Sequence, residues 1–218
     1  TDFNIGPDNK TKNTLNIQPV IPIELNADWN LITRTILPVT SQPELFPGQD
    51  RTNGLGDVAF TAFLSPKEPG KIIWGAGPMF LLPTATDDVL GADKWALGIS
   101  GVALTMIDNW VIGGLASNRW SVAGSGDNDD NLFTFQYFVN YNLPGGWYLT
   151  SAPIITANWE ADSDNRWTVP FGGGAGRIFK IGNQPVIAQL SAYYNVETPD
   201  NFGAEWQMRA QVQFMFPK

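Results

Sequence analysis

The chain has 218 residues, of which 43% are hydrophobic and 16% are charged, with a net charge of −8 and a sequence pI near 4.4. It contains neither cysteine nor histidine, which excludes disulfides, thiolate metal sites, the usual zinc sites and Ser-His-Asp or Cys-His catalysis. The acidic charge argues against nucleic acid, which binds a basic face. The length suits one all-β domain over residues 1–218.

Alternating apolar and polar residues between turn signals predict about eleven strands and no helix. In chain order these strands cover residues 12–25, 28–39, 55–65, 71–83, 94–106, 109–123, 131–143, 147–160, 166–180, 184–197 and 204–216. The last one is the clearest, because its even positions from Trp206 to Phe216 are apolar while Gln207, Arg209, Gln211 and Gln213 are polar. Prolines weaken several of these assignments, since proline removes a ladder donor: Pro19, Pro22, Pro78, Pro153 and Pro170.

The connections between predicted strands alternate in length. Short ones lie at 25–29, 65–71, 106–110, 143–147 and 180–185, and long ones at 40–54, 83–94, 123–131, 160–166 and 197–205. This alternation predicts an up-and-down meander with turns at one end and loops at the other. The long loops and residues 1–10 together hold 16 of the 21 acidic residues, so the loop end should be strongly negative.

All nine tryptophans lie near the ends of predicted strands. Trp29, Trp74, Trp110 and Trp147 lie beside short turns, and Trp95, Trp120, Trp159, Trp167 and Trp206 lie beside long loops. Indole rings favour the two membrane interfaces, so this pattern predicts an aromatic girdle on a transmembrane barrel whose apolar parity faces lipid. The alternative is a soluble lipocalin-like barrel or sandwich with the apolar parity inside, although a barrel of this size would need a central plug.

The direction of the strands bears on how many there are. If the short turns are periplasmic, strands 12–25 and 204–216 both run inward, which leaves residues 1–10 on the outer side. Because single-chain bacterial barrels have an even number of strands, we expect about twelve, with an N-terminal strand that is short or missing. It would be formed by residues just upstream of Thr1 or be lost. Direct pairing of 12–25 with 204–216 would contradict this expectation.

Five stretches carry a family resemblance: LNIQPVIPIEL, DWNLITRTILPV, WGAGPMFLLPTATDDVLG, NYNLPGGWYLTSAPIITANWEAD and RWTVPFGGGAGRIFKIG. Together, from about Asn4 to Lys218, they resemble a family of Gram-negative outer-membrane β-barrel proteins described as transporters and linked by name to the meta-cleavage pathway of phenol degradation. The resemblance implies a small outer-membrane barrel and brings no catalytic motif. One departure from the wider outer-membrane pattern is that Pro217 and Lys218 follow Phe216, where an aromatic residue often ends the last strand.

If the polar parity faces inward, a set of polar residues should line the lumen. It comprises Asn16, Gln18, Glu24, Arg34, Asp57, Arg119, Gln136, Asn140, Gln189, Tyr193, Asn195, Gln207, Arg209, Gln211 and Gln213. Such a lining would select small solutes by size and charge. Alternatively, Arg34, Arg119 and Arg209 pair with Glu24 and Asp57 and close the lumen.

Two further motifs are better explained by their structural setting than by metal or phosphate binding. The acid clusters Asp87–Asp88 and 127–130 could bind calcium or bridge divalent ions to lipopolysaccharide, but neither has calcium-loop spacing, and solvated loop charge is the simpler interpretation. FGGGAGR, 171–177, superficially resembles a phosphate loop. A strand pattern follows it where a phosphate loop would lead into a helix, so we expect the glycines to relieve crowding or permit curvature.

The sequence thus predicts a monomeric, porin-like barrel in the bacterial outer membrane, acting as a passive channel or transporter for small solutes. We expect no enzyme activity, cofactor or metal. The expected partners are outer-membrane lipid and lipopolysaccharide, with small solutes or a protein as further candidates and no nucleic acid. Two alternatives stay open: a plugged, non-conducting barrel with a structural or partner-binding role, and lateral uptake of hydrophobic compounds through an opening in the wall.

Overall fold

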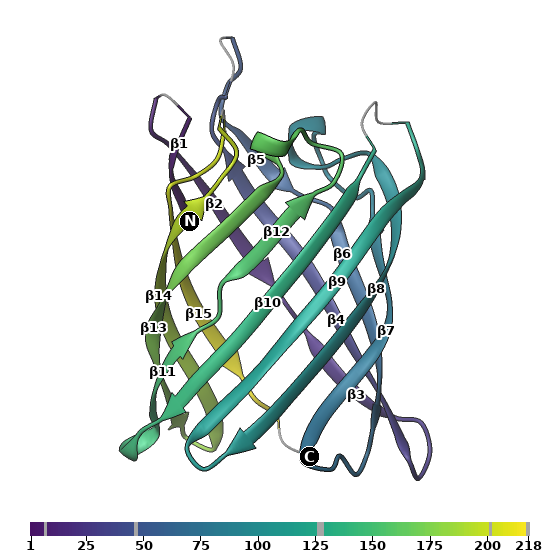
Figure 1. Ribbon diagram of the computed structural model, residues 1–218, viewed down its shortest axis with the longest axis vertical. Helices are drawn as coiled ribbons and strands as arrows, with labels where there is room; N and C mark the ends of the chain where they lie inside the picture. Colours follow the sequence, from purple (N-terminus) through teal and green to yellow (C-terminus); the bar gives the residue numbers. More distant parts are fainter. Residues whose placement is uncertain (7, 46–47, 126–128, 201, 217–218) are drawn as a thin grey trace.

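A computed structural model describes the chain except for residues 7, 46–47, 126–128, 201 and 217–218. Fifteen antiparallel strands form one sheet that closes into a barrel (Figure 1). Within the described residues, the helices are three 3-10 turns of three residues each: η1 (Asp88–Leu90), η2 (Pro144–Gly146) and η3 (Ser163–Asn165). The all-β prediction is confirmed, and no helix in this part of the chain is long and apolar enough to cross a membrane.

The strands follow the predicted segments closely. They are β1 (Asp2–Ile5), β2 (Lys10–Ile17), β3 (Val20–Glu24), β4 (Trp29–Gln42), β5 (Thr52–Leu55), β6 (Val58–Pro66), β7 (Ile72–Leu82), β8 (Lys94–Ile107), β9 (Trp110–Gly124), β10 (Asn131–Asn142), β11 (Trp147–Ser151), β12 (Ile154–Asn158), β13 (Trp167–Ile181), β14 (Gln184–Glu197) and β15 (Trp206–Phe214). The predicted loop 40–54 is shorter than expected, because β4 continues to Gln42 and pairs with β5 there.

The fifteen strands occupy twelve positions in the barrel, because three positions are interrupted. β2 and β3 keep one register along β4, with Ile17 opposite Leu37 and Val20 opposite Arg34, and are separated at Pro19. β11 and β12 are likewise separated at Pro153. Proline cannot donate to the ladder, so both prolines stand where the strand is broken.

The first barrel position is β1, which is only four residues long. It pairs with β15 through Asp2 and Gln207, and with β2 through Asp2 and Lys12. The predicted count of about twelve with a short first strand is therefore confirmed, and β1 lies between the two segments that were expected not to pair directly. The prediction that this strand is formed by residues upstream of Thr1, or is lost, is wrong, because Asp2–Ile5 form it.

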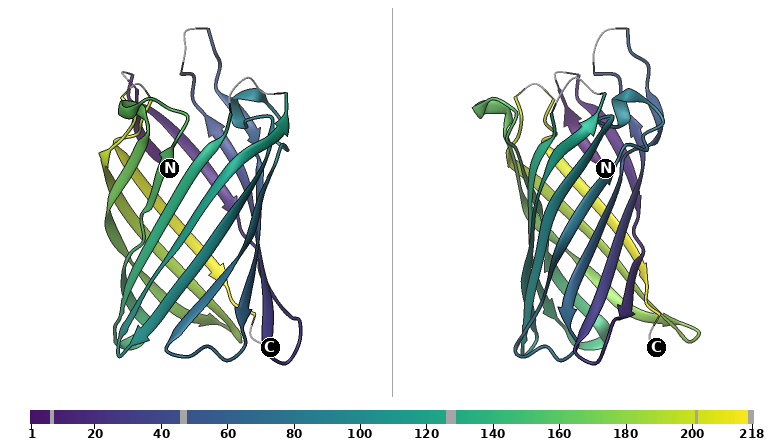
Figure 2. Two further views of the ribbon diagram at one scale, coloured as in Figure 1. Left: turned by 45° about the vertical axis from the view of Figure 1, so that its right-hand side comes forward. Right: turned by 90° about the vertical axis from the view of Figure 1, so that its right-hand side faces the viewer.

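The two ends of the barrel differ as the connection lengths predict. Long connections gather at one end, which we call the loop end, and short ones at the other, the turn end (Figures 1 and 2). The loop end carries the connections after β1, β4, β7, β9, β12 and β14, whereas the turn end carries those after β3, β6, β8, β10 and β13. The expectation about the end of the chain at Pro217 and Lys218 lies outside the described residues.

Burial shows which parity of each strand faces inward. On β14, Ser191 and Tyr193 are 2% and 0% exposed, whereas Leu190 and Tyr194 are 56% and 45% exposed. Alternate residues point to opposite faces of a strand, so the polar parity points into the barrel. Strand pairing carries this assignment around the wall, beginning with Tyr193 opposite Gln207 on β15.

The outward parity forms an exposed apolar belt. Ile17, Ile99, Leu190 and Val212 are each more than half exposed and stand on four different strands. All nine tryptophans have the outward parity and lie near the ends of strands. Some pack against each other, as the Trp29 and Trp74 rings do at 6.1 Å. The outer surface therefore has an apolar middle bordered by two rings of indoles.

Candidate functional site

The barrel interior is where the chain concentrates polar side chains on one face. Members of the predicted lumen set that lie in strands all have the inward parity, and Gln18, in the break between β2 and β3, continues it: Asn16, Gln18, Glu24, Arg34, Arg119, Gln136, Asn140, Gln189, Tyr193, Asn195, Gln207, Arg209, Gln211 and Gln213. Asp57 is the exception, because it lies between β5 and β6 near the loop end. Sequence reasoning missed Asp2 and Lys12, which face each other across the β1–β2 pair on the same inward parity as Gln207.

A polar cluster forms around the break between β11 and β12. The carbonyl of Ala152 has left the ladder and accepts hydrogen bonds from Arg209 Nη1 at 3.0 Å and Gln136 Nε2 at 3.2 Å. The Ala152 amide donates to the Tyr193 hydroxyl at 3.4 Å, and the Arg209 guanidinium lies 5.3 Å from the centre of the Tyr193 ring. An unpaired backbone group inside a wall is costly, so these lumen side chains complete the ladder at Pro153.

The Tyr148 ring packs against Gly176 of β13. Its hydroxyl donates to Gln189 Oε1 at 2.9 Å, and Gln189 Nε2 in turn donates to Ser191 Oγ at 3.1 Å. A Cβ at Gly176 would stand 2.3 Å from the Tyr148 ring, and no side chain fits there while the tyrosine keeps this position. FGGGAGR lies in the extended strand β13, so the glycines relieve crowding as the sequence analysis expected.

Several apolar side chains line another part of the inner wall. Phe63 on β6, Met79 and Leu81 on β7, and Ala96 on β8 have the inward parity and are at most 9% exposed. The same parity holds the buried hydroxyl groups of Thr61 on β6 and Ser100 on β8, so this part of the inner face mixes apolar side chains with small polar ones.

The charged residues find partners on neighbouring strands and loops, both at the rims of the barrel and within it. Arg119 Nε lies 2.5 Å from Asp130 Oδ2, so the predicted pairing of Arg119 with Glu24 or Asp57 is wrong. Arg34 Nη2 donates to Gln18 Oε1 at 3.0 Å. Glu24 forms an ion pair with Lys67 at 3.1 Å at the turn end. These contacts link neighbouring strands and loops, because an arginine side chain reaches its own neighbours before it reaches the far wall.

Asp57 anchors the connection between β7 and β8. Its Oδ1 accepts from the amides of Thr84 and Ala85, both at 3.1 Å, and its Oδ2 accepts from the amide of Ala92 at 2.8 Å. The Thr86 amide adds a bond to the Leu55 carbonyl at 3.0 Å. Asp57 thus fixes a loop, where the sequence suggested a lumen-lining role.

The acidic loop clusters show ordinary loop contacts. Asp87 caps η1 by accepting from the Val89 amide at 3.1 Å, and Asp129 lies 3.5 Å from Lys94. Asp127 and Asn128 lie outside the described residues. In the part of the chain that the structure describes, no three acidic side chains are grouped as metal ligands.

A surface ion pair at the loop end joins Lys10 to Glu44, with Nζ and Oε1 2.5 Å apart. The hydrogen bond with Lys10 lowers the pKa of the Glu44 carboxyl, and the same bond raises the pKa of Lys10. Because the Glu44 pKa is lower in the folded chain, the ion pair stabilises the loop contact at pH values above the carboxyl pKa of the unfolded chain. This stabilisation is lost as the pH falls through the carboxyl pKa of the folded chain.

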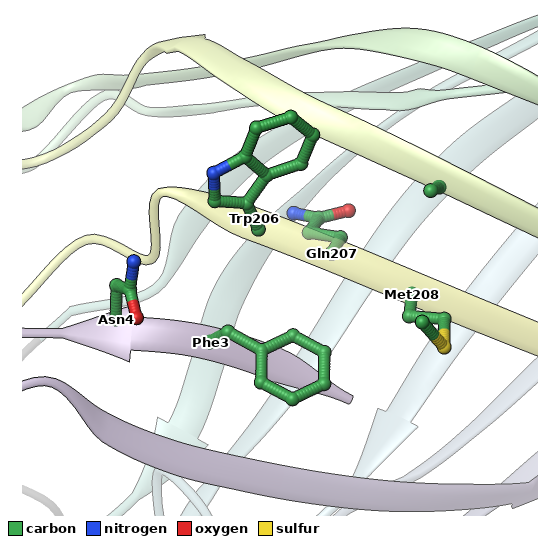
Figure 3. A pocket seen from close by; sticks show the side chains of 6 residues that line it. Phe3, Asn4, Trp206, Gln207 and Met208 are labelled. Atoms are coloured by element: carbon green, nitrogen blue, oxygen red, sulfur yellow. The ribbon is translucent and has the colours of Figure 1, made fainter.

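A cavity of about 350 Å³ lies at the junction of β1 and β15 (Figure 3). It is lined by Phe3, Asn4, Ala192, Trp206, Gln207 and Met208. Phe3 is opposite Trp206 in the ladder, and both have the outward parity. This groove therefore opens on the outer surface, and Gln207 lines it from the inward parity.

No model of a known protein family matches the sequence, and no curated protein matches it. Among solved structures, the chain is similar to the crystal structure of an outer membrane channel from Pseudomonas putida F1, with a TM-score of 0.69 and 19% sequence identity. The match covers 94% of this chain and 84% of that chain. At this identity the likeness establishes the closed antiparallel barrel, and the resemblance to the phenol-degradation family stays a prediction.

Replacing Gly176 with alanine tests the packing of Tyr148. The new methyl group must displace the ring and break its bond to Gln189, so we expect Gly176→Ala to lower the free energy of unfolding by about 1 to 3 kcal/mol. Urea unfolding followed by tryptophan fluorescence measures this. Gly101→Ala is the matched control, because its Cβ would have a nearest neighbour 4.0 Å away. In a Tyr148→Ala background the Gly176→Ala effect should vanish, and an unchanged effect there would contradict the account.

Replacing Asp57 with asparagine tests the loop anchor. Asparagine keeps one acceptor oxygen, so we expect Asp57→Asn to weaken the loop by about 1 to 3 kcal/mol. Hydrogen exchange at the Ala85 and Ala92 amides reports it, with Asp88→Asn on the same loop as control. Equal exchange in both variants would show that the carboxylate does not hold the loop.

Proposed function

We propose that this chain is a monomeric β-barrel of the bacterial outer membrane that conducts small solutes passively. The observation that carries the proposal is the closed barrel whose exposed outer face is apolar while its inner face holds the polar cluster around Ala152. An apolar belt of this extent is unfavourable in water and matches the hydrocarbon of a bilayer. The barrel also satisfies most of its strand hydrogen bonds internally, as lipid requires.

The two rings of tryptophan support the membrane placement. Indoles such as Trp74 and Trp147 at the turn end, and Trp120 and Trp206 at the loop end, are 43% to 49% exposed. Amphipathic rings at two levels match the two interfaces of a bilayer. The turn end would be periplasmic and the loop end external, as in bacterial barrels with short periplasmic turns. The similar Pseudomonas putida protein, an outer membrane channel, agrees with this location.

The hydrogen bonds of the interior argue against a lumen that is closed by ion pairs between opposite walls. The Arg209–Ala152 bond crosses β13 and β14, and the Tyr148–Gln189 bond crosses β13 alone. Side chains held in this way lie along the wall, whereas a plug needs bonds between opposite walls.

Charge gives the proposed channel a direction of selectivity. The acidic loop connections raise the local concentration of cations at the external mouth, and Arg34 and Arg209 inside the barrel oppose their passage. The expected outcome is a weak cation preference that falls as salt rises, because surface charges are screened beyond about 10 Å at 0.1 M ionic strength.

Single-channel current across a planar bilayer tests the function. Refolded protein under a salt gradient should give steady conductance, with a reversal potential of the sign for cations. Arg209→Gln should raise the cation-to-anion permeability ratio, and the pair Asp87→Asn and Asp88→Asn should lower it, each by a factor of roughly two.

The matched control is Lys71→Gln, which changes a charge at the turn end and leaves both the external mouth and the Ala152 cluster intact. Absence of current from protein shown to be folded and inserted would contradict the channel. A cation-to-anion permeability ratio that stays the same in all three charge variants would contradict the proposed origin of selectivity.

A further inference from the structure

The wall of the barrel is incomplete beside β1. Near the loop end, Thr1 exchanges two backbone hydrogen bonds with Met208, at 2.9 and 2.8 Å, and Asp2 is paired on both sides. Toward the turn end, no described residue pairs with the free edge of 209–214 on β15 or with that of 13–24 on β2 and β3. We call the space between these two edges the wall slot.

Exposure of the flanking side chains supports the wall slot independently. Gln211 and Gln213 on β15 have the inward parity and are exposed, whereas Gln189 and Ile187, which lie opposite them on β14, are half-buried. All five residues of β3 are exposed, whichever face they point to. Side chains on both faces of the wall are exposed along the wall slot because a neighbouring strand is lacking on that side.

Backbone groups on both edges point into the wall slot. Met208 bonds to Thr1, while Met215 donates to the Pro185 carbonyl on β14 at 3.0 Å. Because hydrogen-bonding sides alternate along a strand, the amides of Ala210, Val212 and Phe214 face the wall slot.

The facing edge follows the same alternation. The Pro19 carbonyl accepts from Thr35 on β4 at 3.1 Å, so the backbone groups of Asn16, Gln18 and Val20 point away from β4 and into the wall slot. Pro22 also occupies a slot-facing position, where its missing amide removes one donor from the free edge. Unpaired backbone groups are not tolerated where a wall faces lipid, so the wall slot requires a partner.

We propose that the wall slot binds one extended polypeptide strand that continues β1 beyond Thr1 and pairs with β15 and β2–β3 together. The Thr1–Met208 bonds already set the direction and register of such a strand. A second barrel would bring one strand edge, which cannot satisfy two facing edges only one strand apart. The inference does not depend on conduction.

The existing register fixes the pattern of the occupant. Continued from Asp2, it places the position before Thr1 opposite Arg209 and Thr14, on the inward parity, and the next one opposite Ala210 and Leu15, on the outward parity. The bound strand should therefore alternate polar residues toward the lumen with apolar residues toward the belt.

The test adds six residues before Thr1, which span the partners 209–214. One variant carries the matching sequence Val-Gln-Leu-Thr-Val-Asn, in which the asparagine adjoins Thr1 and faces inward. The control has the same composition with the alternation shifted by one residue. Amide hydrogen exchange is measured by NMR in detergent micelles, for the chain alone and for both variants.

We expect the matching extension to slow exchange at Ala210, Val212 and Phe214 by roughly tenfold or more, and the shifted control to leave them fast. The Gln211 and Gln213 amides, which face β14, should be slow in all three proteins and show that each is folded. Slow exchange at Ala210, Val212 and Phe214 in the chain alone would overturn the proposal, because the edges would already be closed on each other. Fast exchange at these amides with the matching extension would also overturn it.

Discussion

The structure depends on one constraint, which is that backbone amides and carbonyls in the wall must find partners within the sheet. Closing the sheet satisfies this along most of the circumference, and each exception has a visible consequence. At Pro153 the ladder breaks, and Arg209, Gln136 and Tyr193 supply the bonds that the Ala152 backbone needs. Beside β1 the ladder is open, and the wall slot results.

The same constraint explains how the interior is arranged. Side chains that serve the wall lie against it, as Arg209 does over the Tyr193 ring and Tyr148 does over Gly176. Glycine at 176 keeps the tyrosine close to the backbone of β13. The polar side chains of β10 to β15 are therefore held against the wall by their own hydrogen bonds.

The fold was largely predictable from the sequence because its signals are local. A period of two places Gln207 and Arg209 on one face of β15 and Trp206 and Met208 on the other, whatever the neighbouring strand is. The alternation of short and long connections predicted the meander, and the positions of the tryptophans predicted the two rings of indoles. The sequence analysis did not predict β5 or the residues that form β1, since both strands are only four residues long.

The partners of polar residues were not predictable, because they depend on which backbone groups are left open. The sequence analysis placed Asp57 among the lumen-lining residues. In the structure it binds three amides of a loop that begins more than twenty-five residues later. Arg119 has no sequence signal that favours Asp130 over any other acid. The Ala152 cluster joins residues from three strands to the break between β11 and β12, and Pro153 was the one available hint that a carbonyl there needed a partner.

The most direct test of the account asks which parity faces lipid. Since the chain has no cysteine, single variants Gln136→Cys, Gln189→Cys, Phe135→Cys and Leu190→Cys each carry one thiol for an environment-sensitive fluorophore in lipid vesicles. We predict that labels at Phe135 and Leu190 are quenched by spin-labelled lipid, and that labels at Gln136 and Gln189 are quenched by aqueous iodide. The opposite pattern would contradict the barrel with a polar interior and an apolar outer face.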